Sequence, residues 1–358
     1  MSLTGFHRLR IADRRQETAE AVSLAFEVPE RLRAVFAFRP GQYLTLRCDI
    51  DGQQVRRAYS ICSGAGDGEV RVAIKHVSDG VFSSHANAVL LAGDEIDVMA
   101  PEGRFGYRPD GAVCGVYLGV AAGSGITPIL SIMASILAVE AASRFVLLYG
   151  SRNTAGILFR SVLEDLKDRY LDRLVVVHAL SREAQDVAAL NGRLDGAKLR
   201  ALAPGLVDAR GIAQAFVCGP AEMLDELPGV LVELGMAAER IQVERFTSSV
   251  ALGVRLVAAV KADDAAVAIA TIIHDGASHD VPMAAGETVL DAALRAGLDL
   301  PWSCHGGMCS TCRARVTAGG VRMDANFSLE KWETEAGYAL TCQSHPTTAR
   351  LVVDYDHR

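Results

Sequence analysis

Four cysteines near the C-terminal end of the chain have the types and spacing to bind a metal centre together. They are Cys304, Cys309 and Cys312, in the pattern C-x4-C-x2-C, and Cys342, which follows 30 positions later. Two iron ions bridged by sulfide require four thiolate ligands, and this spacing is typical of a 2Fe–2S cluster. A structural zinc site is the alternative, but its cysteines usually come as two close pairs. The spacing therefore predicts a 2Fe–2S cluster.

The residues between the first two cysteines suit a tight loop around such a cluster. Gly306 and Gly307 lack a Cβ atom, so the backbone can fold closely and direct amide N–H groups at sulfur. A Rieske centre replaces two cysteines with two histidines, whereas all four cysteines are present here. We therefore predict that His305 is a surface residue of the loop and not a ligand.

A glycine-rich loop in the middle of the chain could bind the pyrophosphate of a nucleotide. Gly123, Ser124, Gly125 and Thr127 follow the apolar stretch Val116–Val120. A loop that leads from a buried strand into a helix presents free N–H groups and the positive end of the helix dipole to phosphate. Thr127 is predicted to cap that helix. Glycine turns after buried strands are common, so it is the position on the first strand of a doubly wound sheet that favours a nucleotide site.

Two short segments in the N-terminal third could hold a flavin nucleotide. Arg57, Tyr59 and Ser60 offer a guanidinium group for phosphate, an aromatic face for a ring system and a hydroxyl donor. In isolation, the same residues also fit an ordinary strand with one exposed arginine. A second candidate phosphate loop contains Gly80, Ser83 and Ser84. The order of these segments along the chain favours the flavin site.

The choice between the two nicotinamide nucleotides is argued from charge. Arg152, Ser181 and Arg182 end two predicted strands, and no Asp or Glu is expected at these strand tips. An acidic side chain there favours a ribose 2′-hydroxyl, whereas an arginine accommodates a 2′-phosphate. We therefore expect NADPH, with NADH and merely solvated arginines as the alternatives.

Length, composition and charge limit the classes of protein to consider. The chain has 358 residues, of which 50% are hydrophobic, and its formal net charge is −7. This length predicts two or three domains with their own cores, and the composition excludes a disordered chain. The negative charge gives no basic surface for nucleic acid or for an anionic membrane. Residues 111–139 carry no charge, but the glycine loop interrupts them, so we predict a strand, a loop and a helix and no membrane span.

The remaining cysteines favour a cytoplasmic protein. Cys48, Cys62, Cys114 and Cys218 occur singly, in sequence surroundings that are apolar, where free cysteine behaves as a small hydrophobic residue. A disulfide framework is expected in short secreted domains, and no secretory leader is visible at the start of this sequence.

Three regions must position these groups. Residues 1–108 alternate apolar and polar side chains, notably over Val70–Lys75, and predict a small antiparallel β-barrel. Residues 109–246 alternate apolar runs with helix-length segments such as 158–170 and 221–234, and predict a doubly wound α/β domain with a parallel sheet. Residues 247–266 are predicted to be a linker. Residues 267–358 predict an α+β domain with a hairpin that turns at Asp275, a helix capped by Thr288 and a helix end at Gly297.

The order of these motifs resembles the ferredoxin–NADP reductase family, followed by a plant-type 2Fe–2S ferredoxin. This arrangement is similar to the reductase components of multicomponent oxygenases, and the resemblance covers about residues 38–358. It implies an FAD-binding barrel, an NAD(P)-binding domain and a β-grasp ferredoxin domain. The segments that carry it are Arg57-x-Tyr59-Ser60, Gly80-x-x-Ser83-Ser84, Gly123–Pro128, Cys218-Gly219-Pro220 and the cysteine pattern.

The resemblance implies a role for each matching residue. Arg57, Gly80, Ser83 and Ser84 would contact the FAD phosphates, and Tyr59 would pack on the isoalloxazine ring. Two residues would lie at the reacting atoms: Ser60 near flavin N5, and Cys218 near the nicotinamide ring. Cys218 fits a packed strand end equally well. The nicotinamide nucleotide would contact Gly123, Ser124, Gly125 and Thr127. Glu244 and Phe246 match the segment that ends near the flavin, but here a linker follows Phe246.

The implied function is electron transfer from NADPH through FAD and the 2Fe–2S cluster to an oxygenase protein. A diiron oxygenase is the first choice of acceptor. The alternatives are another oxygenase, such as a steroid or aromatic-ring hydroxylase, a hybrid-cluster protein, a non-catalytic scaffold with zinc, or a self-contained flavin enzyme. Residues 267–358 hold 7 Lys and Arg against 11 Asp and Glu. Glu330, Glu333 and Glu335 could form an acidic surface that steers docking, or simply a solvated face.

Overall fold

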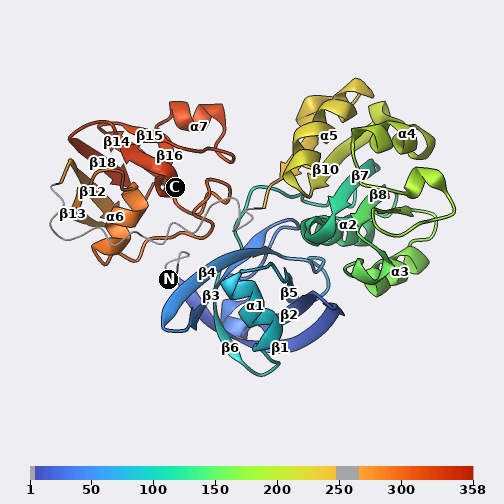
Figure 1. Cartoon of the computed structure of the whole chain (residues 1–358), viewed down its shortest axis with the longest axis horizontal. Coiled ribbons are helices and arrows are strands. Elements are labelled where there is room, and N and C mark those ends of the chain that lie inside the picture. The colour runs from blue at the N-terminus through green and yellow to red at the C-terminus, as the bar shows by residue number, and fades with distance from the viewer. Residues whose placement is uncertain (1–4, 247–265, 358) are drawn as a thin grey trace. The chain divides into compact units, whose positions relative to one another are not determined.

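A computed structural model describes residues 5–246 and 266–357 and divides the chain into two compact units, Met1–Phe246 and Thr247–Arg358. The first unit contains an antiparallel sheet and a parallel sheet, and the second contains a mixed sheet (Figure 1). The predicted linker falls almost entirely outside the described residues. The predicted boundary between the first two regions lies inside the first unit and stays a prediction.

The antiparallel sheet of the first unit has the strand order β4-β3-β6-β1-β2-β5. A bridge between Ile61 and Val72 joins its two edges, so the sheet closes around a core that includes Leu24, Leu44 and Val98. Helix α1 packs against β4 and β5. The predicted barrel is therefore confirmed. The elements are β1 Phe6–Thr18, β2 Ala21–Glu27, β3 Tyr43–Ile50, β4 Gln53–Ser60, β5 Val70–Lys75, α1 Val81–Ala88 and β6 Glu95–Met99.

One strand of the barrel departs from the predicted alternation. Alternation in β5 predicts that Arg71 faces solvent, but its side chain is only 4% exposed. Its guanidinium group contacts the carboxylates of Asp13 and Glu69 and the hydroxyl of Ser23. A buried guanidinium is tolerated because opposite charges and hydrogen bonds replace its water.

The parallel sheet has the strand order β11-β10-β7-β8-β9, and both of its faces are covered, as predicted. Helices α2 and α3 bury one face around Ile129 and Leu163, and α4 and α5 bury the other around Leu199 and Leu227. The strands are β7 Val116–Ala122, β8 Arg144–Ser151, β9 Leu174–Leu180, β10 Ile212–Cys218 and β11 Ile241–Glu244. The helices are α2 Ile126–Val139, α3 Arg160–Arg169, α4 Gly196–Leu206 and α5 Ala221–Glu233.

The uncharged stretch 111–139 becomes β7, a glycine turn and α2, as expected. In residues 5–246 and 266–357, no helix has both the length and the apolar content needed to cross a membrane.

The second unit contains a five-stranded sheet with the order β13-β12-β18-β14-β16. The predicted hairpin, helix cap and helix end are all present: Thr288 accepts a hydrogen bond from the N–H of Asp291, and Gly297 has φ 83°. The strands are β12 Ala268–His274, β13 Ala277–Met283, β14 Arg313–Ala318, β15 Val321–Met323, β16 Tyr338–Leu340, β17 Ser344–Pro346 and β18 Arg350–Asp354. The helices are α6 Val289–Arg295 and α7 Lys331–Glu335.

Candidate functional site

The four cysteines of the second unit lie in two pairs. The thiols of Cys304 and Cys309 are hydrogen-bonded to each other, as are those of Cys312 and Cys342, and only longer-range electrostatics link the pairs. No three of these sulfur atoms lie within 4.8 Å of one another. Tetrahedral zinc with Zn–S bonds of about 2.3 Å would hold all four sulfurs about 3.8 Å apart. Two separate pairs fit two iron ions, so the residues suit a 2Fe–2S cluster better than zinc.

The loop between Cys304 and Cys309 directs backbone N–H groups at sulfur, as the two glycines predict. The hydrogen bond from Cys309 lowers the pKa of Cys304 to about 6, and the amides of Gly306, Met308 and Cys309 add to this effect. The N–H of Gly306 lies 3.3 Å from the Cys304 sulfur. These donors stabilise the thiolate form, which is the form that binds iron.

A neighbouring segment fixes the same loop from outside. Gly307 has φ 73°, and a Cβ atom there would lie 2.8 Å from the carbonyl oxygen of Ala325. Its own carbonyl accepts a hydrogen bond from the N–H of Phe327. Glycine is therefore required at position 307, both for its φ and for the close approach. His305, predicted at the surface, is only 34% exposed at its side chain and lies edge-on to Trp302.

The prediction of an acidic surface around α7 is wrong for one of its three glutamates. Glu330 and Glu335 are exposed, but the side chain of Glu333 is completely buried. Its carboxylate accepts the backbone N–H of Glu330 in a capping box and lies 2.9 Å from the guanidinium group of Arg313. Because Glu333 is the third residue of α7, its side chain folds back over the helix start instead of facing solvent.

The segments predicted to hold a flavin meet on the barrel. The ring of Tyr59, on β4, lies 5.5 Å from that of Phe82, in the first turn of α1. Burial raises the pKa of Tyr59, which keeps its hydroxyl protonated. Ser60 is buried beside it, and Arg57 is half-buried, with its guanidinium group donating to the carbonyl of Arg56. A flat aromatic face, a hydroxyl and a cation are thus gathered at the start of one helix.

The N-terminus of α1 contains the second predicted phosphate segment. Gly80 is the N-cap residue of the helix. The hydroxyl of Ser83 accepts the N–H of Val77 and donates to the carbonyl of Gly80, so it holds the turn together. Ser84 lies 3.2 Å from the imidazole of His76. The backbone N–H groups of this first turn and the Ser84 hydroxyl can meet a phosphate, whereas the Ser83 hydroxyl has partners within the turn.

The glycine loop of the parallel sheet begins its helix earlier than predicted. Residues Gly123–Gly125 form a 3-10 turn, and α2 begins at Ile126, with Gly125 as its N-cap residue. Thr127 therefore lies inside the helix, and its hydroxyl donates to the carbonyl of Ser124 instead of capping. The expectation that Thr127 caps the helix is wrong because the 3-10 turn extends the helical backbone toward the strand.

The two glycines of this loop have different surroundings. Gly123 has φ 55°, and a Cβ atom added there would meet no other atom within 4 Å, so its backbone is open to a ligand. Gly125 is packed against the end of β10, where a Cβ atom would collide with the carbonyl of Cys218. The thiol of Cys218 is completely buried, and burial raises its pKa well above the ordinary value. Glu244 pairs with Cys218 along the backbone, and Phe246, two residues later, is 37% exposed.

The ends of β8 and β9 bring the two predicted arginines together. The N–H of Arg182 donates to the carbonyl of Arg152, and that of Ser181 donates to the carbonyl of Ser151. The guanidinium group of Arg152 lies 3.7 Å from the carboxylate of Glu20 in the barrel.

An acidic side chain lies at this edge that the sequence argument did not anticipate. The carboxylate of Glu183, directly after Arg182, accepts hydrogen bonds from the backbone N–H and the hydroxyl of Thr154, at 2.7 and 2.6 Å. Glu183 lies one residue beyond the predicted end of its strand, and this position in the sequence could have indicated an acidic side chain at the edge.

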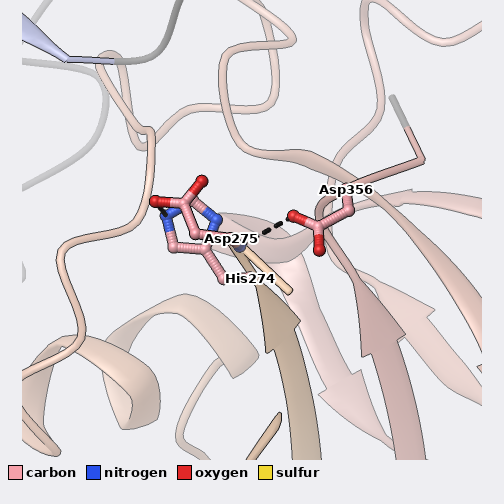
Figure 2. Close-up of side chains that lie close together, drawn as sticks. All are labelled: His274, Asp275 and Asp356. Atoms are coloured by element: carbon pink, nitrogen blue, oxygen red, sulfur yellow. Dashed lines mark hydrogen bonds and ion pairs between the residues drawn. The ribbon is translucent and has the colours of Figure 1, made fainter. Parts of the chain in front are cut away.

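Two further groups of residues lie outside these sites. A cavity of about 540 Å³ lies beside the first residues of β7 and β8, at the sheet edge opposite the glycine loop, and its lining includes Arg144 and Arg240. Cys114 also lines it and is exposed, which corrects the apolar surroundings predicted for this thiol. In Figure 2, His274, Asp275 and Asp356 lie together, but the Asp356 carboxylate accepts the N–H groups of Asp275 and Gly276 and so closes the β12–β13 turn.

Comparison with known families identifies one domain for each of the three predicted cofactors. Residues 8–107 match the family described as an oxidoreductase FAD-binding domain, residues 120–227 an oxidoreductase NAD-binding domain, and residues 272–347 a 2Fe-2S iron-sulfur cluster binding domain. The chain is 43% identical to a subunit of 1,2-phenylacetyl-CoA epoxidase from Escherichia coli over 99% of both chains. It is 36% identical to the ferredoxin reductase component of 3-ketosteroid-9-alpha-monooxygenase of Mycobacterium tuberculosis, over 97% of this chain and 95% of the other.

Among solved structures, the chain has the fold of phthalate dioxygenase reductase. The TM-score is 0.56, with 20% identity and 98% of each chain covered. An intact self-sufficient cytochrome P450 monooxygenase matches 97% of this chain with 41% of its own length, at a TM-score of 0.68 and 21% identity.

Proposed function

We propose that this chain carries electrons from NADPH to a phenylacetyl-CoA epoxidase. The chain belongs to the family of FAD- and 2Fe–2S-containing oxidoreductases that serve as reductase components of oxygenases. The single observation that carries the proposal is the 43% identity to one subunit of that epoxidase over 99% of both chains. Such a match over the whole length includes all three cofactor domains and the segments between them.

The barrel residues have the chemistry to hold FAD. We assign Arg57 and the first turn of α1, with Gly80, Ser83 and Ser84, to its phosphates, and Tyr59 and Ser60 to its ring system. Tyr59 offers its aromatic face, and Ser60 a hydroxyl donor. A bound flavin supplies the chemistry that joins the other two cofactors, because it accepts two electrons as hydride and passes them on one at a time.

The edge of the parallel sheet has the chemistry to hold the nicotinamide nucleotide. Gly123, Ser124 and Gly125 lie between β7 and α2, and Thr127 lies in the first turn of α2, where parallel sheets of this type bind pyrophosphate. We assign Cys218 to the region of the nicotinamide ring, where its buried neutral thiol excludes water. Glu244 and Phe246 follow on the neighbouring strand and are assigned to the same region.

NADPH is the proposed donor, and the arginines at the ends of β8 and β9 support this choice. Arg152 and Arg182 are adjacent, and Ser181 adds a hydroxyl. Guanidinium groups bind phosphate with paired hydrogen bonds, so this cluster suits the 2′-phosphate that distinguishes NADPH from NADH.

The paired cysteines are assigned to the cluster, and the acceptor is an oxygenase protein. Thiolate ligands require reduced cysteines, which supports a cytoplasmic location. We retain four regions as the proposed organisation: FAD-binding residues 1–108, NAD(P)-binding residues 109–246, a linker at 247–266 and the ferredoxin domain at 267–358. A 3-ketosteroid monooxygenase is the second candidate acceptor, because its reductase component is 36% identical to this chain.

Two measurements test the proposal. An anaerobic NADPH titration, followed by visible absorbance and low-temperature EPR, is expected to bleach the flavin and then produce the signal of a reduced 2Fe–2S cluster. Purified oxygenase components of phenylacetyl-CoA epoxidase and of 3-ketosteroid-9-alpha-monooxygenase are then supplied in parallel, with NADPH and their substrates. Product formation with the epoxidase supports the assignment. Turnover with the steroid enzyme alone would replace it, and zinc in place of iron would refute the electron relay.

A further inference from the structure

The carboxylate of Glu183 lies beside the predicted phosphate-binding arginines but is bonded to another residue. Thr154, in the short turn after β8, donates both its backbone N–H and its hydroxyl to this carboxylate. The two hydrogen bonds end on different oxygens of Glu183, so they hold the carboxylate in one orientation. We call this pair of residues the Thr154–Glu183 clamp.

The position of the clamp gives it consequences for nucleotide binding. In the strand order β11-β10-β7-β8-β9, β8 is the neighbour of the strand that carries the glycine loop. The end of that neighbouring strand is where dinucleotide-binding sheets recognise the adenosine ribose. A free carboxylate there accepts hydrogen bonds from ribose hydroxyls and repels a 2′-phosphate, whereas an arginine binds the phosphate.

The charges around the clamp show why it matters whether the Glu183 carboxylate is bonded to Thr154 or free. Arg152 already has an acidic neighbour, because Glu20 lies 3.7 Å from its guanidinium group and 3.9 Å from the ammonium group of Lys75. Among the residues that the structure describes, the guanidinium group of Arg182 has no carboxylate within ion-pair distance. Glu183 is the next residue in the chain, and the clamp engages both of its oxygens.

We propose that Thr154 determines nucleotide specificity by holding the Glu183 carboxylate away from Arg182, which leaves that guanidinium group for the 2′-phosphate of NADPH. The inference rests on the proposed function, because it assigns the ends of β8 and β9 to the nucleotide. Thr154 acts through Glu183 and is a positioning residue.

Four forms of the full-length holoprotein test the proposal: wild type, Thr154→Val, Glu183→Gln and the double variant. Thr154→Ser keeps the hydroxyl and serves as the matched control. Binding is measured by calorimetry with 2′,5′-ADP, which carries the 2′-phosphate, and with 5′-ADP, which lacks it. The ratio of kcat/KM for NADPH to that for NADH is measured in the same buffer at low ionic strength, because salt screens exposed charges.

The clamp predicts a specific pattern. Thr154→Val removes the hydroxyl donor and leaves the carboxylate held only by the backbone N–H, so one of its oxygens is free to turn toward Arg182. We expect this change to weaken 2′,5′-ADP binding about threefold to fivefold, the size of one exposed charge interaction. Binding of 5′-ADP stays within about twofold on the same scale. The change appears in KM for NADPH and not in kcat. The double variant regains wild-type selectivity, because glutamine has no charge to repel phosphate.

Other outcomes distinguish a failure of the clamp proposal from a failure of the NADPH assignment on which it rests. Equal weakening of both nucleotides by Thr154→Val, without recovery in the double variant, would show that the clamp only stabilises the turn. Unchanged selectivity in Thr154→Val would also overturn the proposal. A wild-type protein that binds 2′,5′-ADP no better than 5′-ADP would instead refute the NADPH assignment itself, whatever the variants do.

Discussion

The cluster site and the nucleotide site differ in how far apart their residues lie in the chain. Three of the proposed cluster ligands come from nine consecutive positions, Cys304–Cys312, and the fourth follows 30 positions later. The proposed nucleotide site gathers residues from the ends of β7, β8, β9 and β10, between Gly123 and Cys218. The first site takes three of its four ligands from one loop, whereas the second depends on the pairing of four strands. Substitutions should therefore have different effects in the two places.

The largest effect is expected from removing a cluster ligand. Cys342→Ser removes one thiolate of the Cys312–Cys342 pair, so the cluster is lost and electron transfer to the oxygenase falls to background. Reduction of the flavin by NADPH continues, because that site lies in the first unit. Iron content, EPR and flavin bleaching measure the three effects, and Cys114→Ser, at an exposed thiol, is the control. Loss of flavin reduction in the same variant would show that the two sites are not independent.

The nucleotide site is tested by adding one methyl group to its glycine loop. In Gly125→Ala the new Cβ collides with the carbonyl of Cys218, so the loop and the end of β10 must separate. Overpacking of this kind costs about 1–3 kcal/mol, and we expect kcat/KM for NADPH to fall about tenfold to a hundredfold.

Gly123→Ala is the matched control for that variant. Its Cβ meets no atom within 4 Å, and only the positive φ of 55° opposes it, at a cost of about 1 kcal/mol. Steady-state kinetics of both variants, with calorimetric binding of 2′,5′-ADP, make the comparison. If Gly123→Ala is the more damaging change, open space above the loop matters more than its packing on β10.

Two glutamates of α7 test whether the framework of the cluster domain depends on buried charge. Glu333→Gln leaves the guanidinium group of Arg313 without its carboxylate, which should cost about 3 kcal/mol of unfolding free energy. Glu335→Gln, at an exposed position, should leave stability within about 0.5 kcal/mol and change only the salt dependence of oxygenase reduction. Urea denaturation measures the first effect, followed by the fluorescence of the two tryptophans, both of which lie in this unit. Equal stability of the two variants would contradict the buried ion pair.

A smaller effect than the loss of the buried Arg313–Glu333 pair is a pH dependence of stability in the same unit. Burial raises the pKa of Glu287, but hydrogen bonds from Arg295 and from the N–H of Ala284 outweigh it, and the net pKa is lowered. A lowered pKa in the folded state contributes stability above the unfolded pKa of about 4.3, which is lost as the pH falls through the folded value.

Glu287→Gln measures this contribution. The variant should be less stable than wild type at neutral pH by about 1–3 kcal/mol, because Arg295 loses its charged partner. The difference should shrink below about pH 4, where wild type becomes protonated as well. Denaturation curves at several pH values check the sign. A difference that grows on acidification would mean that the folded pKa is raised.

Much of the protein follows from local sequence. The cysteine spacing predicted the cluster, and the alternation of apolar runs with helices predicted a parallel sheet covered on both faces. The Thr288 cap and the turn at Asp275 were also correct. These features depend on residues close together in the chain, where backbone geometry and hydrogen bonding act over a few positions.

Other features were decided only by the tertiary structure. Arg71 is buried because Asp13 supplies charge from β1, two strands away in the sheet, and Glu69 from the chain just before β5. Glu333 is buried because Arg313 lies beneath α7, and Gly125 is required because β10 ends against the glycine loop. The carboxylate of Glu183 is bonded to Thr154, 29 positions earlier in the chain. Residue types and spacing identify the kinds of chemistry, but which charges are paired depends on contacts between segments that only the folded chain brings together.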